Sequence, residues 1–246
     1  MNRAELRVVT FNIAHGRGRD GAVDLRRTAG ALAAVQADVV CLQEVDRHFS
    51  ERSGWADQAS DLADHLGMTA VYGVALRRPA LQPGRPPRDY GNAILSRRPM
   101  ERHRVIRLPG RPRSEPRSLV IAELAGGTQV ACLHLQHDSA PARAEQVAVV
   151  ARELPSDVPV VLAGDLNAAP DALELRALHA RLVDCWPASG KGRGATFPSR
   201  FPLRRLDYVL VSAGIAPQRA DVLPTAASDH RPLVVDLLVD PEQSRQ

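Results

Sequence analysis

Polar side chains able to do chemistry interrupt or end several apolar runs of this chain. Burying a carboxylate costs several kcal/mol unless it is paired or binds a cation, so carboxylates at these positions need an explanation. A loop cap or a strand-end hydrogen bond would account for any single one. Together they predict a site at the strand ends, where layered α/β proteins build their sites. The group consists of Asn12, Glu44, His134, Asp165, Asn167, Asp207, Asp229 and His230.

The residue types in this group indicate which ion such a site would hold. Asp, Glu and Asn oxygens are hard ligands of the kind that Mg²⁺ and Mn²⁺ prefer. No cluster of Cys and His in the sequence has the spacing of a zinc site. The group therefore favours Mg²⁺ or Mn²⁺ as the cofactor.

Short apolar runs of strand length, several of them rich in Val and Ile, carry these polar residues. They cover 6–13, 38–45, 69–76, 90–96, 118–124, 128–135, 158–166, 206–212 and 232–239, and helical patterns cover 24–35, 58–66, 141–154 and 171–182. Gly126-Gly127 between two alternating runs predicts a tight hairpin. About nine strands with few helices predict two stacked sheets with helices on their outer faces.

Eight short motifs follow one another along the chain. In order they are TFNI, LQEVD, YGNAILSR, EPRS, HL, GDLNAAP, RLDYVL and SDHRPL. This set resembles the endonuclease/exonuclease/phosphatase superfamily, which includes DNase I-like nucleases, apurinic endonucleases, deadenylases, sphingomyelinases and inositol-phosphate 5-phosphatases. The resemblance extends from Val8 to about Leu238. It implies an α/β fold: a four-layer α/β sandwich of two mixed, mainly antiparallel β-sheets packed face to face, with helices outside. It also implies phosphoester hydrolysis with a divalent cation and without a covalent intermediate.

The same resemblance implies roles for the residues that match the motifs. Glu44 matches the principal metal ligand, Asn12 the asparagine beside it, and Asp229 a further carboxylate near the metal. Asp165 matches the aspartate that orients or deprotonates the attacking water, and Asn167 matches its partner. Water near neutral pH is a poor nucleophile, so a base and a metal ion are needed to activate it.

Further matches concern groups that contact the phosphate. His230 resembles the histidine that hydrogen-bonds a phosphate oxygen, and Asp207 resembles the aspartate that holds that imidazole. His134 resembles a second catalytic histidine. Tyr90 is assigned to the catalytic group, and we expect Arg117, Asn92 and Arg88 to bind substrate. An imidazolium and an arginine aimed at the nonbridging oxygens would stabilise the charge of the transition state.

Two features depart from the family pattern. The second histidine lies in L-H-L-Q-H, so His137 is an extra imidazole, for which a surface or supporting role is favoured. The stretch RSGWADQ at 52–58 resembles small bacterial members whose substrates we cannot assign. In that stretch, Arg52, Ser53, Asp57 and Gln58 either line the pocket or form an ordered loop cap.

The basic charge is concentrated in one window of the chain. The formal net charge is +4, but the window from Arg77 to Arg117 carries 12 Arg and three acidic residues, so it is +9 and the remainder is −5. The window contains Tyr90 and ends at Arg117. It therefore predicts a mouth that attracts a phosphate-bearing polyanion.

The substrate class stays open between three phosphoesters. A nuclease is the first hypothesis, because phosphate contacts dominate nucleic-acid affinity, although aromatic residues make up only 4% of the chain. A phospholipid or sphingomyelin-type phosphodiesterase would need an apolar docking loop, for which FPSRFPL at 197–203 is the candidate. A phosphatase of inositol phosphates or nucleotides is third. A catalytically inactive binding module is least favoured because the motif residues are all present.

Length and composition set the remaining expectations. The 246 residues, 44% hydrophobic and 24% charged, suit a folded chain, expected as a single domain over 1–246 with its core at about 6–239. No apolar run is long enough to span a membrane, and no signal-peptide pattern precedes the first strand. Cys41, Cys132 and Cys185 are expected to be reduced, buried thiols of a cytoplasmic protein, which we expect to be a monomer.

Overall fold

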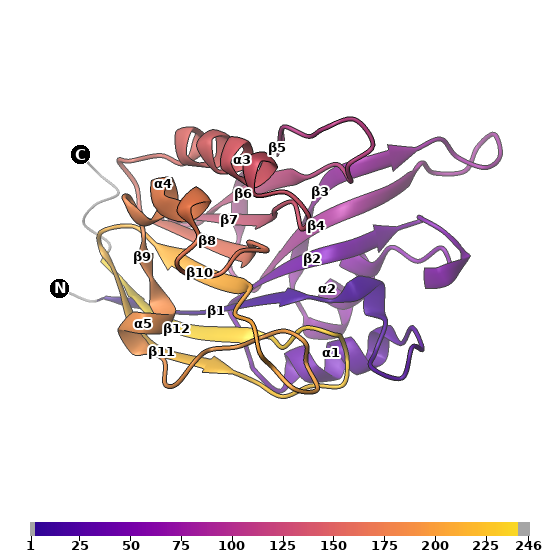
Figure 1. Cartoon of the computed structure of the whole chain (residues 1–246). Coiled ribbons are helices and arrows are strands. Elements are labelled where there is room, and N and C mark those ends of the chain that lie inside the picture. The colour runs from indigo at the N-terminus through magenta and orange to yellow at the C-terminus, as the bar shows by residue number, and fades with distance from the viewer. Residues whose placement is uncertain (1–2, 241–246) are drawn as a thin grey trace.

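The computed structural model describes residues 3–240, which form two six-stranded sheets packed face to face (Figure 1). In the first sheet the strands lie in the order β11-β12-β1-β2-β4-β3. Strands β1 and β2 are parallel and the other pairs are antiparallel. The bounds are β1 (Ala4–Asn12), β2 (Val39–Arg47), β3 (Thr69–Arg78), β4 (Arg88–Ser96), β11 (Ile215–Val222) and β12 (Leu233–Val239).

The second sheet has the order β5-β6-β7-β8-β10-β9. Here β7 and β8 form the parallel pair, and the remaining neighbours are antiparallel. The bounds are β5 (Met100–Arg107), β6 (Ser118–Leu124), β7 (Gln129–His134), β8 (Val160–Asp165), β9 (Val183–Asp184) and β10 (Asp207–Val211). Each sheet thus has one parallel pair near its centre, and the prediction of two mixed, mainly antiparallel sheets is confirmed.

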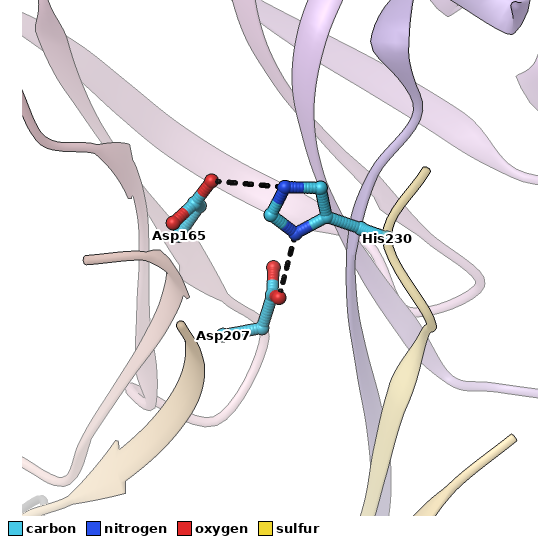
Figure 2. Close-up of side chains that lie close together, drawn as sticks. All are labelled: Asp165, Asp207 and His230. Carbon is cyan, nitrogen blue, oxygen red and sulfur yellow. Dashed lines mark hydrogen bonds and ion pairs between the residues drawn. The ribbon is translucent and has the colours of Figure 1, made fainter. Parts of the chain in front are cut away.

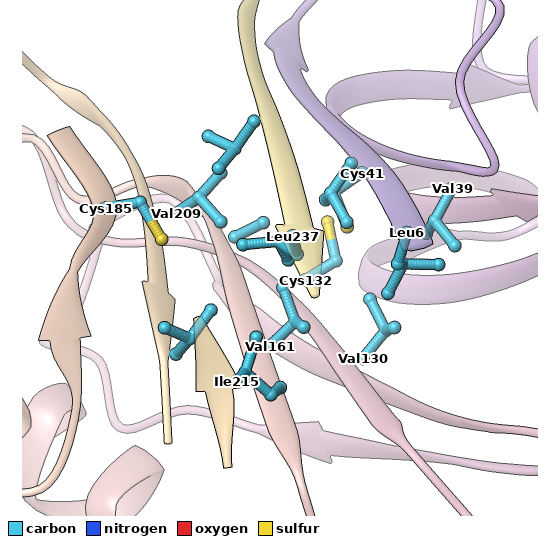
Figure 3. Packing of buried hydrophobic residues seen from close by; sticks show 14 of the residues in the cluster. Leu6, Val39, Cys41, Val130, Cys132, Val161, Cys185, Val209, Ile215 and Leu237 are labelled. Carbon is cyan, nitrogen blue, oxygen red and sulfur yellow. The ribbon is translucent and has the colours of Figure 1, made fainter. Parts of the chain in front are cut away.

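Three apolar clusters separate four layers. The central cluster joins the inner faces of the two sheets and contains the three cysteines, all free and buried (Figure 3). A second cluster packs α1 (Leu25–Ala33) and α2 (Gln58–Leu66) on the first sheet. A third packs α3 (Ala140–Glu153), α4 (Arg176–His179) and the 3₁₀ turn Leu173–Leu175 on the second sheet. This is the expected four-layer sandwich. No helix within residues 3–240 has the length and hydropathy needed to cross a bilayer.

Apolar runs predicted nine strands correctly, but three strands carry no such run. β5 contains three arginines and is largely exposed, and β11 contains a proline and polar residues. Both lie at a sheet edge, where one side of the strand faces no partner and charged residues are tolerated. β9, also at an edge, has only two residues. Edge strands lack the buried pattern on which the prediction depended.

The helical patterns at 24–35, 58–66 and 141–154 are confirmed to within about two residues. The pattern at 171–182 is wrong as one helix, because that segment forms a 3₁₀ turn followed by the four-residue α4. The helix α5 (Cys185–Ser189) was not predicted. The hairpin at Gly126-Gly127 is confirmed: both glycines have positive φ and join antiparallel β6 and β7.

The two parallel pairs bring the ends of four strands to one edge of the sandwich. β1 ends at Asn12, beside the C-terminal half of β2, and β7 and β8 end together with His134 opposite Asp165. Asp165 also faces Asp207 at the start of antiparallel β10. Strand register therefore places polar side chains from both sheets at this edge.

Candidate active site

Asp165 lies at the centre of the polar cluster formed by these strand ends. Its carboxylate is 1% exposed, and Oδ1 accepts a hydrogen bond from the backbone N–H of Asn167 at 2.9 Å. Oδ2 accepts one from Nδ2 of Asn12 at 3.2 Å. Oδ2 also lies 3.4 Å from Nε2 of His134 and 3.7 Å from Nε2 of His230 (Figure 2 shows the contact with His230). One carboxylate oxygen thus faces three nitrogen groups from three separate strands or loops.

Burial raises the pKa of Asp165 to about 7. The positive charge of His230 opposes this shift, and the negative charge of Asp207 adds to it. An aspartate whose pKa is near neutrality is suited to accept a proton from water and to release it again. The environment of Asp165 is therefore that of a general base.

His230 is held by Asp207 on the side of the ring away from Asp165. Its Nδ1 lies 2.8 Å from Oδ2 of Asp207, a carboxylate that is fully buried (Figure 2). Burial alone would lower the pKa of His230, but the charges of Asp207 and Asp165 raise it to about 10. The ring of Phe197 packs against the imidazole with a centroid distance of 4.9 Å. His230 is thus a fixed imidazolium at neutral pH, able to donate from Nε2.

His134 is the opposite case, a neutral imidazole. Burial and the nearby charge of Arg117 lower its pKa well below the usual value. Arg117 donates from Nη1 to Nδ1 of His134 at 3.0 Å, so we assign the ring proton to Nε2, which lies 3.4 Å from Oδ2 of Asp165. The same Nη1 contacts Glu115, and the side chain of Arg117 is only 4% exposed. Arg117 is a buried cation that orients His134.

Glu44 reaches the cluster through an irregularity in β2. The pairing of β2 with β4 shifts register between Leu42 and Val45, and Glu44 has a φ of +58°, which is uncommon for a residue other than glycine. This local backbone strain turns the side chain toward Asn12, whose Nδ2 donates to Oε1 of Glu44 at 3.0 Å. A single amide nitrogen therefore connects Glu44 with Asp165.

The surroundings of Glu44 favour a cation. Burial raises the pKa of Glu44, the hydrogen bond from Asn12 lowers it, and the negative charges of Glu115 and Asp229 raise it further. Arg117 is the positive group that opposes them. A divalent ion bound here would relieve the repulsion between these carboxylates, and their oxygens are the ligands that Mg²⁺ and Mn²⁺ prefer.

A second arrangement of ligand atoms lies at the centre of the site. Asp165, Asp207 and His230 each offer one atom, and these atoms lie within 4.8 Å of one another. The raised pKa of His230 favours a proton in this position at neutral pH, and a protonated imidazole cannot bind a metal ion.

The remaining predicted site residues lie at different depths. Tyr90 is buried near Glu44, whose charge, together with burial, raises the pKa of the phenol. Asp229 is exposed and accepts a hydrogen bond from Ser228. Arg88 lies at the start of β4 and donates to the carbonyl of Pro79. The catalytic role of Tyr90, the metal-binding role of Asp229 and the substrate-binding role of Arg88 stay predictions.

Asn92 is placed differently from the prediction. Its side chain is 2% exposed, and Nδ2 donates to the carbonyl of Ser118 at 2.9 Å, which joins β4 to β6. The residue shares a strand face with Tyr90 but lies two residues deeper, between the sheets. Because its amide is engaged in holding the sheets together, we do not carry the substrate-binding prediction for Asn92 further.

For the 52–58 segment the sequence left two alternatives, an ordered loop cap and a lining of the pocket, and its residues divide between the cap and the vicinity of Tyr90. Asp57 caps α2 by accepting from Ser60, and the hydroxyl of the buried Ser53 bonds the carbonyl of Ser50. Gln58 bonds the backbone of Asp46 and of His15. These three form a loop cap. Arg52, in contrast, lies over the ring of Tyr90. His137, the extra imidazole, is exposed.

The basic window does not form a single mouth, and that prediction is wrong for part of it. Arg97 and Arg98 follow β4 at the end opposite to Tyr90, where Arg98 contacts the carbonyl of Glu5. Other arginines are neutralised by acidic partners, as in the pairs Arg77–Asp89, Arg102–Glu123 and Arg104–Glu153. The two ends of a strand lie at opposite edges of its sheet, so arginines at both ends of β4 cannot line the same site.

Two contributors to the site were missed in the sequence. Glu115 binds Arg117, and Phe197 packs on His230. The motif EPRS contained both Glu115 and Arg117, and the position of the glutamate two residues before the arginine was a usable signal. Nothing in the spacing of Phe197 and His230 pointed to their contact.

Comparison with known proteins gives one family. The family model described as the endonuclease/exonuclease/phosphatase family matches residues 9–230. The uncharacterized protein YbhP of Escherichia coli strain K12 is 32% identical over 228 residues, which cover 84% of this chain and 85% of that protein.

Solved structures are similar in fold. An endonuclease/exonuclease/phosphatase from Beutenbergia cavernae superposes with a TM-score of 0.82 and 28% identity, over 97% of this chain and 72% of that one. The mannosyl-6-phosphatase Bt3783 of Bacteroides thetaiotaomicron has a TM-score of 0.75 at 19% identity, over 94% of this chain and 99% of that one. The second likeness concerns the fold alone.

Proposed function

This chain belongs to the endonuclease/exonuclease/phosphatase family, and from that premise we propose that it is a divalent-metal-dependent phosphodiesterase that acts on nucleic acid. Members of the family hydrolyse phosphoesters and use divalent metal ions. The observation that carries the proposal is the position of Asp165 between Asn12 and Glu44 on one side and the two imidazoles on the other.

The residues of this cluster can perform hydrolysis in one step. Asp165 takes a proton from water while the water oxygen attacks phosphorus and the P–O bond to the ester oxygen breaks; that oxygen leaves as an alkoxide and takes up a proton from solvent. Asn167 and Asn12 orient the carboxylate through their hydrogen bonds. The imidazolium of His230 donates from Nε2 to a phosphate oxygen as negative charge develops there, and Asp207 keeps that imidazole charged.

Glu44, Asn12 and Asp229 are the residues that would hold the cation. Their oxygens suit Mg²⁺ or Mn²⁺, and the repulsion that raises the pKa of Glu44 is the feature that the ion would relieve. When bound, the cation lowers the pKa of water and polarises phosphate oxygens. The other residues of the site bind, orient and move protons around it.

Arginines at the start of β4, where Arg88 precedes Tyr90 by two residues, support a nucleic-acid substrate. A hollow of about 530 Å³ lies beside the start of β4, and its lining includes Trp55, Arg85 and Arg88. Among residues 3–240, no carboxylate lines this hollow. Trp55 is 40% exposed, so an aromatic face is available for a base to stack on, next to arginines that can bind phosphates.

One observation favours a second candidate, a lipid phosphodiesterase. In the loop that supplies Phe197 to the site, Phe201 is 68% and Leu203 is 75% exposed. Large apolar side chains this exposed suit insertion into a lipid surface. The same loop carries Arg200, which lies with Asp229 in another hollow at the site.

A substrate panel tests the proposal. Purified protein with Mg²⁺ or Mn²⁺ would be incubated with plasmid DNA, single-stranded DNA, RNA, bis-p-nitrophenyl phosphate, sphingomyelin vesicles, inositol phosphates and a sugar phosphate. We expect hydrolysis of a nucleic acid and of the synthetic diester. Turnover confined to sphingomyelin would establish the second candidate, and turnover confined to monoesters would establish a phosphatase. If no substrate of the panel is hydrolysed, the remaining hypothesis is that the protein is a catalytically inactive binding module.

A further inference from the structure

Arg52 is an arginine held rigidly outside the catalytic cluster. It belongs to the 3₁₀ turn Glu51–Ser53 that follows β2. Its guanidinium donates from Nε and Nη2 to the two carboxylate oxygens of Asp46, at 2.9 and 2.7 Å. The side chain of Asp46 is fully buried, whereas that of Arg52 is 39% exposed. This two-pronged contact fixes the plane of the guanidinium.

Two aromatic rings complete the support of Arg52. Its Cζ lies 4.8 Å from the ring centroid of Phe49 and 5.7 Å from that of Tyr90. The two rings are themselves in contact, with centroids 5.8 Å apart. Cations over aromatic faces are attracted by the ring quadrupole, so the rings and Asp46 hold the guanidinium in one position.

The position is beside the catalytic cluster but not within it. Asp46, which holds Arg52, pairs with Tyr90 across β2 and β4 and lies two residues after Glu44. No hydrogen bond or ion pair connects Asp46, Phe49, Tyr90 or Arg52 with Asp165 among residues 3–240. Arg52 thus lies next to the Glu44 side of the cluster without contacting Asp165.

One end of the guanidinium is uncommitted. Nε and Nη2 are engaged by Asp46, and within the described part of the chain Nη1 has no hydrogen-bond partner. A half-exposed, oriented N–H group next to a phosphoester site matches an anionic oxygen.

We propose that Arg52 binds, through Nη1, the phosphate next to the scissile phosphate, so that the protein prefers substrates with a chain of phosphodiesters. This inference rests on the proposed function, because it assumes that a phosphoester is hydrolysed at Asp165. Arg117 and His230 lie in the cluster around Asp165 and serve the scissile group. Arg52 contacts none of these residues and lies over Tyr90, so it is available for an adjoining phosphate of the same strand.

The test compares two substrates that differ in the neighbouring phosphate. A short oligonucleotide has adjoining phosphates, whereas bis-p-nitrophenyl phosphate has a single diester. Arg52→Gln is expected to raise KM for the oligonucleotide at least about tenfold, the size of a lost hydrogen bond to a charged group. We expect its kcat, and both constants for the synthetic diester, to stay within about twofold.

Arg47 offers a matched control. It also contacts a buried aspartate, with Nη2 2.6 Å from Oδ2 of Asp89, and it lies over an aromatic ring, that of Tyr72, at 4.3 Å. Arg47→Gln removes the same kind of contact, although Asp89 keeps a second partner, Arg77, whereas Arg52 is the one ion-pair partner of Asp46 among the described residues. The KM of Arg47→Gln for both substrates should stay at the wild-type value. Thermal unfolding would show that each variant is folded.

A second variant guards against a loss of structure. Arg52→Lys keeps the charge and the apolar stem over Phe49 but cannot bond Asp46 twice and a phosphate as well. We expect the same selective rise in KM, smaller than in Arg52→Gln. An equal loss of activity on both substrates, or no change on either, would overturn the role of Arg52.

Failure of the proposed function can be told apart from failure of this inference. If the wild-type protein hydrolyses neither diester, binding of a fluorescently labelled oligonucleotide in EDTA decides the matter, because no turnover is needed. Weaker binding by Arg52→Gln than by Arg47→Gln supports the phosphate contact. Equal binding by the two variants rejects it.

Discussion

Nδ1 of His230 lies 2.8 Å from Oδ2 of Asp207, although 23 residues separate the two in the sequence. Both side chains are buried, and the other oxygen of Asp207, Oδ1, has no hydrogen-bond partner among the described residues. The charge of Asp207 is therefore directed at a single imidazole. This pair keeps His230 protonated, and it makes the site dependent on a residue that does not face the substrate.

Asp207→Asn should preserve the shape of the site and remove this charge. The pKa of His230, raised to about 10 by Asp207 and Asp165, is expected to fall toward its ordinary value. We expect kcat/KM at pH 8 to fall by about 10²-fold. Titration of the His230 ring by NMR in both proteins would measure the shift. An unchanged pKa would show that Asp207 does not hold the proton.

Asp165→Asn and His230→Ala should each lower kcat by at least about 10²-fold, since one removes the base and the other a charged donor to phosphate. Steady-state kinetics on the best substrate of the panel would measure this. His137→Ala is the control, because His137 is exposed and its side chain makes no hydrogen bond within residues 3–240. Wild-type rates in both site variants would refute the assigned roles.

The pH dependence follows from two groups with opposite active forms. Asp165 acts without its proton and has a raised pKa of about 7, whereas His230 acts with its proton and has a raised pKa of about 10. The kcat/KM should rise through pH 7 and fall as pH approaches 10. A bound cation would move the lower limb to more acidic pH, because it stabilises the carboxylate. Activity that decreases from pH 6 to pH 8 would contradict the assignment of Asp165 as base.

Removal of divalent ions should abolish hydrolysis, and added Mg²⁺ or Mn²⁺ should restore it. Glu44→Gln is expected to raise the metal concentration needed for half-maximal activity by at least about tenfold, since outer partners of metal sites alone contribute 10–100-fold. Titration of metal against rate would measure it. Calorimetric titration with Mn²⁺ gives a readout that does not require turnover. Full activity in EDTA would exclude a catalytic cation.

Salt dependence tests the hollow beside β4. If nucleic acid is the substrate, the affinity should fall steeply with salt, and neutralising Arg85 and Arg88 should reduce the log–log slope by about 1 for each arginine. The matched control neutralises Arg152 and Arg219, which are 71% and 70% exposed on α3 and β11. Equal slopes for the two double variants would show that the hollow does not bind the strand.

Much of the fold could be predicted because the central strands are buried on both faces. Runs such as 118–124 and 158–166 are mainly apolar, with a polar residue only near an end, so their position needed no tertiary information. β5 and β11 could not be found in this way, because an edge strand need not be apolar. Segment 171–182 had a helical pattern, but it packs on the sheet as two short turns.

The sequence by itself determined which groups are available and that they belong at strand ends: the base Asp165, the carboxylate Glu44 and the imidazoles. Motif order also identified the family. Tertiary structure decided how these groups meet. Asn12 reaches Glu44, 32 residues away, and Asp165, 153 residues away, because the inner strands of two sheets end at the same edge.

Tertiary structure also decided the direction of single side chains. Glu44 turns toward Asn12 because β2 has a bulge there and Glu44 has a positive φ. The local sequence around Glu44 gives no indication of that bulge. The charge window from Arg77 to Arg117 was correct as a count, but β4 separates Arg88 at its start from Arg97 and Arg98, which follow its other end. The sequence specifies which residues are charged. The position of each charge in the fold depends on strand direction and register, and these are set by contacts between segments that are distant in the sequence.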